Sequence, residues 1–357
     1  MKSLEDIGYT ADLDAAFRAL DAPHLVPGRV AGVNRSNFDI LWEGGLLRAE
    51  PTGRLLFAAD DSTEIPTVGD WVAMQTLNDD TFGLIHHLLP RRSVLRRKDP
   101  GRNVEYQLLG ANIDTALCMQ SADRDYNLNR LERYLVMVRD GGIAPVVVLT
   151  KSDLVDEEER AMMLDGLRET AGDVPCLFIS TQEGVGLESV RKLLTPGTTA
   201  CLLGSSGVGK TTLLNALLGG ESFATRDVRE TDHRGRHTTT RRQLLMLDSG
   251  ALLIDSPGLR ELGSFGADAG FSETFGDIER LAAECRFKDC THQHEKGCAV
   301  IAAIEAGELD AGHFENYEKM QREAAHYERS YLERRRRDRE FGKMVKRITK
   351  NNDKRNR

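Results

Sequence analysis

The stretch GSSGVGKT, residues Gly204 to Thr211, decides how the rest of this sequence is interpreted. It fits the pattern of a phosphate-binding loop and lies between the apolar run TACLLG and the leucine-rich run TTLLNALLGG. The first run is typical of a buried strand, and the second is typical of a helix that ends at a glycine pair. We therefore predict that the loop lies at a strand-to-helix turn, where such loops bind phosphates.

Each part of this loop has a chemical role. The glycines let backbone N–H groups close around phosphate oxygens. Lys210 can reach the β and γ phosphates and is our first catalytic candidate, and the Thr211 hydroxyl can hold Mg²⁺. The residues expected to contact the nucleotide here are Gly204, Ser205, Ser206, Gly207, Val208, Gly209, Lys210, Thr211 and Thr212.

The length and composition predict a protein of more than one domain that does not cross a membrane. The chain has 357 residues, of which 40% are hydrophobic, so it is long enough for two or three domains with cores of their own. No apolar run approaches the roughly 18 residues needed to cross a membrane. The first residues, MKSLEDIGYT, lack the apolar segment of a secretory signal. The sequence predicts a soluble protein with no membrane partner.

The six cysteines fall into two groups. Cys118, Cys176 and Cys201 are isolated in apolar runs, whereas the other three are clustered with histidines. This usage favours a reducing, cytoplasmic location, with three core thiols and one metal cluster.

The cluster itself is Cys285, Cys290, His292 and Cys298, with the spacing C-x4-C-x-H-x5-C. Three thiolates and one imidazole suit a closed, tetrahedral and therefore structural zinc site. Free reduced thiols are the alternative, and His294 could replace His292 as the fourth ligand.

The charge is unevenly spread over the chain. The net charge is −8, but residues 333–357 hold twelve Lys/Arg and four Asp/Glu, which gives this tail +8 and the remainder −16. A basic tail is usually a solvated end, and an anionic partner such as RNA is the functional alternative.

The N-terminal third predicts a small barrel. Residues 1–24 carry weak helical periodicity and form an extension. From Gly28 the runs RVAGV, FDILW, LLRAE, RLLFA, DWVAM and GLIHHLL predict five or six strands, hence an antiparallel OB-type barrel over residues 25–98. Such barrels often bind oligonucleotides, and a basic run follows the last strand. Alternatively, the barrel's large aromatic residues simply fill its core. The basic residues are Arg91, Arg92, Arg96, Arg97 and Lys98, and the aromatic ones are Trp42, Phe57 and Trp71.

The central part predicts a parallel sheet covered by helices. Strand-like runs alternate with helical patterns at residues 128–138, at 157–170 and after Gly186. We assign residues 99–266 to this α/β domain, 267–332 to a helical zinc-binding domain and 333–357 to a basic tail. In the helical domain, aromatic and apolar residues recur at helical spacing, which favours a packing face over the alternative of a base-stacking platform. They are Phe314, Tyr317, Met320, Ala324, Tyr327 and Tyr331.

Two segments after the loop fit a magnesium and γ-phosphate site. Asp255, in DSPG, follows a predicted strand and can hold Mg²⁺ through water, while the Gly258 amide can sense a γ-phosphate. In GRHTTT one threonine hydroxyl could complete the Mg²⁺ shell, and Thr239 is our candidate. An ordinary surface loop fits the composition of the second segment equally well.

A segment before the loop fits guanine recognition. Thr150, Lys151, Ser152 and Asp153 form TKSD after the apolar run APVVVL. The Asp153 carboxylate can accept hydrogen bonds from guanine N1–H and its exocyclic amine, a pair that adenine lacks. Lys151 would lay its aliphatic stem along the base. Ser180 follows the next strand-like run and is expected beside them. For a K-x-D segment alone, a solvated loop is the alternative.

The order of these motifs is unusual. In ordinary GTPases the base-reading motif follows DxxG, but here it precedes the phosphate loop. The same site can still form, because ligands bind where strand ends are adjacent in a sheet, whatever their order along the chain. The sequence thus predicts a circularly permuted GTPase domain.

TKSD, GSSGVGKT, GRHTTT and DSPG behind a small barrel resemble the circularly permuted ribosome small subunit-dependent GTPase A family. The resemblance covers residues 25–330. It implies a GTPase that uses GTP/GDP with Mg²⁺, binds the small ribosomal subunit and its rRNA late in subunit maturation, and is stimulated by that subunit. The zinc-binding domain of the family has the same spacing, which favours His292 as the ligand.

The residue after the DxxG glycine predicts slow intrinsic hydrolysis. Many GTPases place a water-orienting Gln there, whereas this chain has Leu259. We expect His237 or the ribosome to supply the missing polar group. Two alternatives remain, an RNA-binding adaptor that uses GTP only as a switch and a P-loop ATPase or small-molecule kinase. We expect a monomer.

Overall fold

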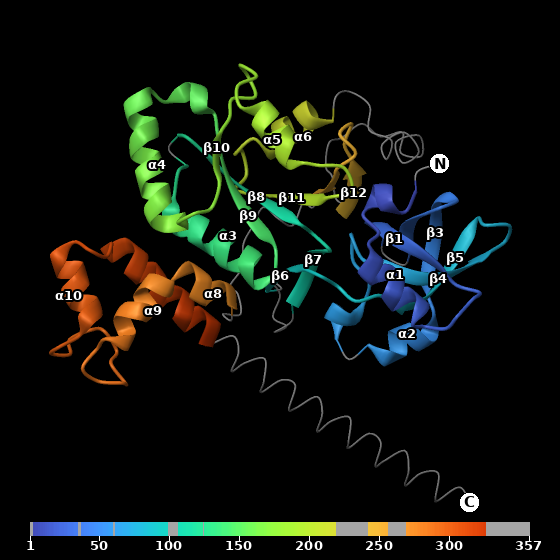
Figure 1. Ribbon diagram of the computed structural model, residues 1–357, viewed down its shortest axis with the longest axis horizontal. Helices are drawn as coiled ribbons and strands as arrows, with labels where there is room; N and C mark the ends of the chain where they lie inside the picture. Colours follow the sequence, from blue (N-terminus) through green and yellow to red (C-terminus); the bar gives the residue numbers. More distant parts are fainter. Residues whose placement is uncertain are drawn as a thin grey trace, which may run out of the picture.

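The computed structural model describes residues 3–34, 37–59, 61–98, 106–123, 125–218, 242–255 and 269–325. These residues form an N-terminal barrel, a central sheet with helices on both faces, and a C-terminal group of helices (Figure 1). This architecture confirms the predicted fold class. In the described part of the chain, every helix is too short or too polar to cross a bilayer.

The barrel is closed. Its strands follow the order β1-β2-β3-β5-β4, and β4 pairs back to β1. The β3–β5 pair is parallel, and the other pairs are antiparallel. Closure pairs the barrel strands with one another, apart from the end of β1, which pairs with residues 242–243 of the central sheet. The strands are β1 (Val26–Val33), β2 (Phe38–Trp42), β3 (Gly45–Pro51), β4 (Trp71–Leu77) and β5 (Phe82–Leu88).

One predicted barrel strand is wrong. RLLFA lies in the helix α2 (Gly53–Ala58), which begins where the Thr52 hydroxyl accepts a hydrogen bond from Leu55 N. Phe57 on this helix is 94% exposed, so it does not fill the barrel core. Trp42 packs against the barrel core, whereas Trp71 is fully buried in the main core of the molecule, where its ring lies 4.8 Å from that of Tyr9.

The N-terminal extension packs onto the rest of the protein. It contains the short helix η1 (Glu5–Ile7) and the helix α1 (Ala11–Arg18). Ile7 and Leu13 are buried in the main core, so this segment belongs to the same hydrophobic core as one face of the central sheet.

The central sheet has the order β10-β9-β8-β11-β13-β12, and only β12 runs antiparallel to its neighbour among the described strands. The parallel sheet predicted from the alternating pattern is thus confirmed. Its strands are β8 (Thr115–Ser121), β9 (Ala144–Thr150), β10 (Cys176–Phe178), β11 (Thr199–Leu203), β12 (Arg242–Met246) and β13 (Leu252–Asp255). Its helices are α3 (Leu128–Asp140), η3 (Ser152–Leu154), α4 (Glu157–Ala171), α5 (Leu187–Leu193) and α6 (Lys210–Leu217).

The sheet separates two apolar cores. Cys118 and Cys201 point into the core that contains α3, whereas Leu117 and Leu202 point into the core that contains α5 and α6. Successive strand residues face opposite sides, so both must be apolar when helices cover both faces. This explains the continuous apolar runs of the sequence and the buried thiols within them.

The strands of the barrel and of the central sheet are joined into one continuous hydrogen-bonded sheet. Strand β1 pairs antiparallel with β12, with Gly32 opposite Gln243 and Val33 opposite Arg242. A separate hairpin of β6 (Val94–Lys98) and β7 (Tyr106–Ala111) connects the two parts along the chain.

A buried arginine also ties the barrel to the central sheet. Arg29 is 1% exposed, and its guanidinium donates to Gly69 O (3.2 Å), Asn112 O (3.2 Å) and Thr199 Oγ1 (2.8 Å). Burial lowers the pKa of Arg29 to about 10, which leaves it charged at neutral pH. Because Thr199 begins β11, one side chain links the barrel to the strand that precedes the phosphate loop.

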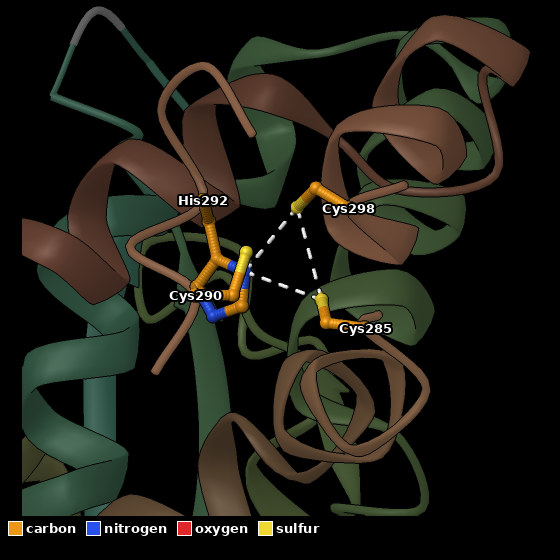
Figure 2. Close-up of side chains that lie close together, drawn as sticks. All are labelled: Cys285, Cys290, His292 and Cys298. Carbon is orange, nitrogen blue, oxygen red and sulfur yellow. Dashed lines mark hydrogen bonds between the residues drawn. The ribbon is translucent and has the colours of Figure 1, made fainter. Parts of the chain in front are cut away.

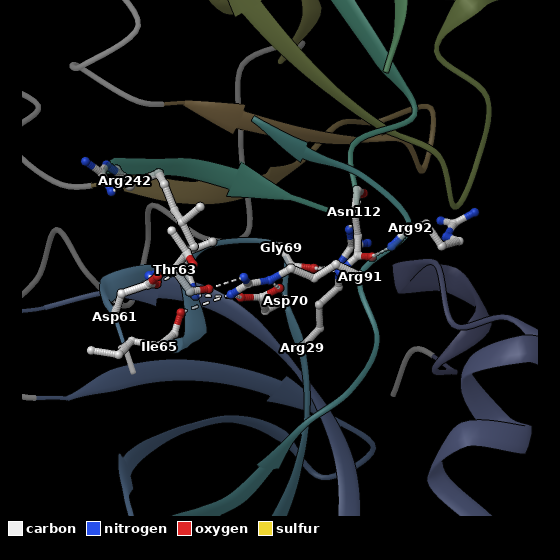
Figure 3. Close-up of polar contacts among 12 residues, drawn as sticks. Arg29, Asp61, Thr63, Ile65, Gly69, Asp70, Arg91, Arg92, Asn112 and Arg242 are labelled. Atoms are coloured by element: carbon white, nitrogen blue, oxygen red, sulfur yellow. Dashed lines mark hydrogen bonds and ion pairs between the residues drawn. The ribbon is translucent and has the colours of Figure 1, made fainter. Parts of the chain in front are cut away.

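The basic run after the barrel is largely committed to internal contacts. Figure 3 shows Arg91 against Asp70, which it contacts through two nitrogens at 2.8 and 2.7 Å. Arg92 and Arg96 pair with carboxylates at 3.3 and 3.2 Å. These arginines fix the segment after the barrel, Arg91 to the barrel itself and Arg92 and Arg96 to Asp114 and Asp140 of the central domain. RNA binding by this run stays a prediction.

The C-terminal helices pack on α3. They are α8 (Ala269–Thr274), α9 (Gly276–Ala283), α10 (Ala299–Ala306) and a helix over residues 311–325. On the last helix, Phe314, Tyr317, Met320 and Ala324 are buried, which confirms the predicted packing face for the described residues. Tyr327, Tyr331 and the basic tail lie outside the described residues.

Candidate functional site

The phosphate loop lies between β11 and α6, as predicted. Gly204, Gly207 and Gly209 have φ values of 155°, 81° and 101°, a region that side chains disfavour. A Cβ on Gly204 would lie 2.8 Å from Met119 O, so glycine is required there. The loop leads into the N-terminus of α6, whose free N–H groups and dipole favour anions.

The Lys210 ammonium lies over this loop. Its Nζ donates to Gly204 O at 2.6 Å and to Ser205 O at 2.5 Å. Thr211 and Thr212 follow in the first turn of α6 and are exposed. The loop therefore carries an ammonium group and is followed at once by two exposed threonines, residue types that suit a phosphate with its metal ion.

The guanine-type segment meets the phosphate loop directly. Strand β9 ends at Thr150, whose buried hydroxyl donates to Val208 O at 2.6 Å. Lys151 follows with φ 56°, and Ser152 N donates to Ile179 O at the end of β10. The two motifs, separated in the sequence and reversed in order, thus lie at one edge of the sheet.

The remaining described candidates lie at the same edge. Asp153 is partly exposed in η3, and Ser180 is buried just after β10, where its hydroxyl accepts a hydrogen bond from Glu183 N at 3.2 Å. Asp255 ends β13, which pairs in parallel with β11, so it lies at the edge that holds the phosphate loop. The Asp255 carboxylate and the Thr211 hydroxyl are hard oxygen ligands, the kind that Mg²⁺ prefers.

Some candidates fall outside the described residues. These are His237, Thr239, Gly258 and Leu259. Their roles in hydrolysis stay predictions.

The predicted metal cluster forms as a compact group (Figure 2). The ligand atoms of Cys285, Cys290, His292 and Cys298 lie within 4.8 Å of one another. Cys285 Sγ is 3.8 Å from Cys298 Sγ and 3.6 Å from His292 Nδ1, and His292 Nδ1 is 3.3 Å from Cys298 Sγ. A tetrahedral zinc ion with ordinary bond lengths separates its ligand atoms by about 3.5–3.8 Å. The donor set and its spacing fit zinc.

The structure places His292, and not His294, in the cluster. His292 has φ 59°, and the backbone N–H of His294 donates to the Glu295 carboxylate at 3.0 Å in the adjoining turn. Cys285 follows α9, and Cys298 is the N-cap of α10, so the cluster joins two helices.

Comparisons with known proteins agree with this geometry. Residues 88–265 match the family model described as RsgA GTPase, and residues 199–332 match a model described as 50S ribosome-binding GTPase. "Small ribosomal subunit biogenesis GTPase RsgA" of Opitutus terrae is 41% identical, over 91% of this chain and 90% of the relative. "Small ribosomal subunit biogenesis GTPase RsgA 2" of Vibrio parahaemolyticus is 43% identical, over 99% and 94%.

The chain belongs to the RsgA GTPase family. It is a GTP hydrolase. The crystal structure of YjeQ from Thermotoga maritima is similar to this RsgA family member, with a TM-score of 0.61, 25% identity, and coverage of 84% of this chain and 99% of that one. The crystal structure of YloQ, a circularly permuted GTPase, is also similar, with a TM-score of 0.60, 24% identity, and coverage of 85% of this chain and 96% of that one, which supports the permuted fold.

In this RsgA family member, two polar residues at the site were missed by motif reasoning. Asp123 and Asp125 follow β8, which lies between β9 and β11 in the sheet. Asp123 accepts a hydrogen bond from Lys151 Nζ at 2.7 Å, and Asp125 accepts one from the Ser205 hydroxyl. The sequence indicates them by position alone, since they come directly after a strand that the topology places between the two strands that lead into the motifs.

Proposed function

We propose that this GTPase binds the small ribosomal subunit and its rRNA, and hydrolyses GTP to GDP and phosphate late in the maturation of that subunit. The observation that carries the proposal is the contact of Thr150 with Val208, which joins a guanine-type segment to a phosphate loop in permuted order. The names of relatives that match most of the chain supply the ribosomal partner.

The small subunit is favoured over the large one. The model whose description names the 50S subunit matches residues 199–332, which omit the barrel. The relatives whose names state small-subunit biogenesis match 84–99% of this chain. The similarity that spans nearly the whole chain, barrel included, therefore favours the small subunit.

In the proposed site, different residues bind the base, the phosphates and the metal ion of the nucleotide. Asp153 accepts hydrogen bonds from guanine, Lys151 lies along the base, and the phosphate loop with Lys210 binds the phosphates. Thr211 and Asp255 would hold Mg²⁺, which neutralises charge on the phosphates when it is bound. The substrate is GTP.

The cluster Cys285, Cys290, His292 and Cys298 would hold one zinc ion. Its role is structural, because all four positions of a tetrahedron are filled by protein ligands. The ion would link the end of α9 to the start of α10, a segment with little apolar core of its own.

Hydrolysis is proposed to be slow without the ribosome. Leu259 cannot orient the attacking water, so a polar group must come from His237 or from the ribosomal subunit. We therefore propose that the subunit stimulates the reaction. His237→Ala should lower the stimulated rate if the chain supplies this group, and leave it intact if the ribosome does.

The test is the rate of phosphate release with and without purified small subunits, with excess ATP as a competitor. We expect stimulation by small subunits, less by large subunits, and no inhibition by ATP. Absence of phosphate release with small subunits present would favour a GTP-dependent adaptor instead, and strong inhibition by ATP would favour an ATPase.

A substitution of Asp153 tests the base assignment separately. Asp153→Asn replaces an acceptor by a donor, so it should weaken GTP binding and strengthen xanthosine triphosphate binding, because xanthine carries a carbonyl where guanine carries an amine. Asp173→Asn, at an exposed position beyond α4, is the matched control. Equal preference of both variants for GTP would contradict the assignment.

A further inference from the structure

The two carboxylates after β8 each connect to a different lysine of the nucleotide site. Asp123 contacts Lys151 directly, through Oδ2 and Nζ at 2.7 Å. Asp125 is connected to Lys210 through one intermediate, Ser205. Since β8 lies between the strands that carry the two lysines, its end is the natural place from which both can be held.

The path from Asp125 to Lys210 uses both polar groups of Ser205. The Ser205 hydroxyl donates to Asp125 Oδ2, and the Ser205 carbonyl accepts from Lys210 Nζ at 2.5 Å. Asp125 is itself held by Arg130 of α3, with Oδ1 at 3.0 Å from Nη1. Fixing the serine from its side chain therefore fixes the carbonyl on which the ammonium rests.

The path from Asp123 to Lys151 starts from a well-anchored carboxylate. Asp123 Oδ1 accepts hydrogen bonds from the Ser121 hydroxyl at 2.6 Å and from Asp125 N at 2.9 Å, which leaves Oδ2 for Lys151. The bond from Lys151, with those from Ser121 and Asp125 N, lowers the pKa of Asp123 to about 2. The carboxylate therefore stays negative across the physiological range.

These contacts contribute little to folding. The side chains of Asp123, Lys151, Asp125 and Arg130 are 27, 38, 40 and 28% exposed, and ion pairs screened by water in this way stabilise a protein only weakly. Their effect is instead expected in the orientation of the groups that touch the nucleotide, where small displacements are costly.

We propose that Asp123 and Asp125 are positioning residues of the nucleotide site, Asp123 holding Lys151 at the base and Asp125 holding Lys210 at the phosphates through Ser205. This inference rests on the proposed binding of a guanine nucleotide. It assigns the turn after β8 a role in the site although it carries none of the recognised motifs.

The two roles predict different ligand dependences. Asp123→Asn removes the charge opposite Lys151, so it should weaken GMP, GDP and GTP by a similar factor, because all three share the base. Asp125→Ala should weaken GDP and GTP and spare GMP, because Lys210 reaches only the β and γ phosphates. Solvent-exposed charged contacts of this kind correspond to an effect of about fivefold.

The experiment measures GMP, GDP and GTP affinity of the full-length protein by competition against a fluorescent GDP analogue. Ser205→Ala should reproduce the pattern of Asp125→Ala, and the double variant should be no weaker than either single one, because both remove the same bond. Ser205→Thr keeps a hydroxyl at this position, so it should bind GDP more tightly than Ser205→Ala does. Asp173→Ala serves as the surface control.

The outcomes separate this inference from the proposed function. If the wild-type protein binds no guanine nucleotide, the proposed function fails. If it does bind but Asp125→Ala and Ser205→Ala leave GDP affinity unchanged, or weaken all three ligands equally, the positioning role of Asp125 is refuted. Unchanged affinities in Asp123→Asn refute the role of Asp123.

Discussion

Raising the pH from 6.5 to about 9.5 should loosen the contact between α3 and the C-terminal helices, because one histidine in that contact must lose its proton. His313 lies between two carboxylates. Its Nδ1 is 2.6 Å from Glu132 of α3, and its Nε2 is 3.3 Å from Asp277 of α9. The side chains of His313 and Glu132 are only 10 and 1% exposed.

The size of the effect follows from the pKa of His313. Burial alone would lower that pKa, but the hydrogen bonds to Asp277 and Glu132 outweigh burial and raise it from 6.5 to about 9. The folded state therefore holds the proton more tightly than the unfolded chain. The resulting stabilisation is about 3 kcal/mol, is fully present below pH 6.5 and is lost as the pH rises through 9.

Two measurements check this prediction in zinc-saturated protein. An NMR titration of the histidine rings should show His313 still protonated at pH 7.5. Urea unfolding of the wild type should lose about 3 kcal/mol more between pH 6.5 and about 9.5 than unfolding of His313→Gln. His24→Gln, at an exposed position, should behave like the wild type. A His313 ring that titrates near 6.5, or equal losses in wild type and His313→Gln, would refute the reasoning.

Three further predictions concern other parts of the molecule. Thr150→Val removes the buried donor to Val208 O without changing side-chain shape, and calorimetry should show GDP affinity falling by about fivefold, against no change if the two motifs act independently. Asp70→Ala leaves the Arg91 guanidinium without its carboxylate partner in a buried setting, so it should destabilise the fold by about 3–5 kcal/mol in urea unfolding. A loss of stability below about 1 kcal/mol would contradict this prediction. Cys298→Ser should lower bound zinc from one equivalent per chain and reduce helical circular dichroism, and a wild type that binds no zinc would rule the metal site out.

The sequence predicted the parts of the fold that depend on local signals. Glycines in a strand-to-helix turn and continuous apolar runs identified the phosphate loop and the parallel sheet, because those residues are required by the nearby backbone. RLLFA was assigned wrongly, because five residues with apolar character do not distinguish a short strand from a helix, and the cap at Thr52 decided the matter.

Contacts between distant parts of the chain could not be predicted in this way. His313 and Glu132 are 181 residues apart, and their pairing depends on how the C-terminal helices dock on α3. Asp123 and Asp125 belong to the site only because β8 lies between β9 and β11. The closeness of the zinc ligands was predictable because Cys285 and Cys298 are only 13 positions apart in the sequence, yet the choice of His292 over His294 required the structure.

The pairing of β1 with β12 has a practical consequence for anyone who divides this protein into parts. Removing the barrel by truncation would remove β1, which pairs with one side of β12. The backbone amide and carbonyl groups on that side of β12 would then be unpaired and exposed to solvent, where they can pair with another copy of the fragment. An excised catalytic fragment should therefore tend to aggregate unless a charged residue or proline is introduced along that newly uncovered border, and low solubility of such fragments would reflect the cut and not a weak core.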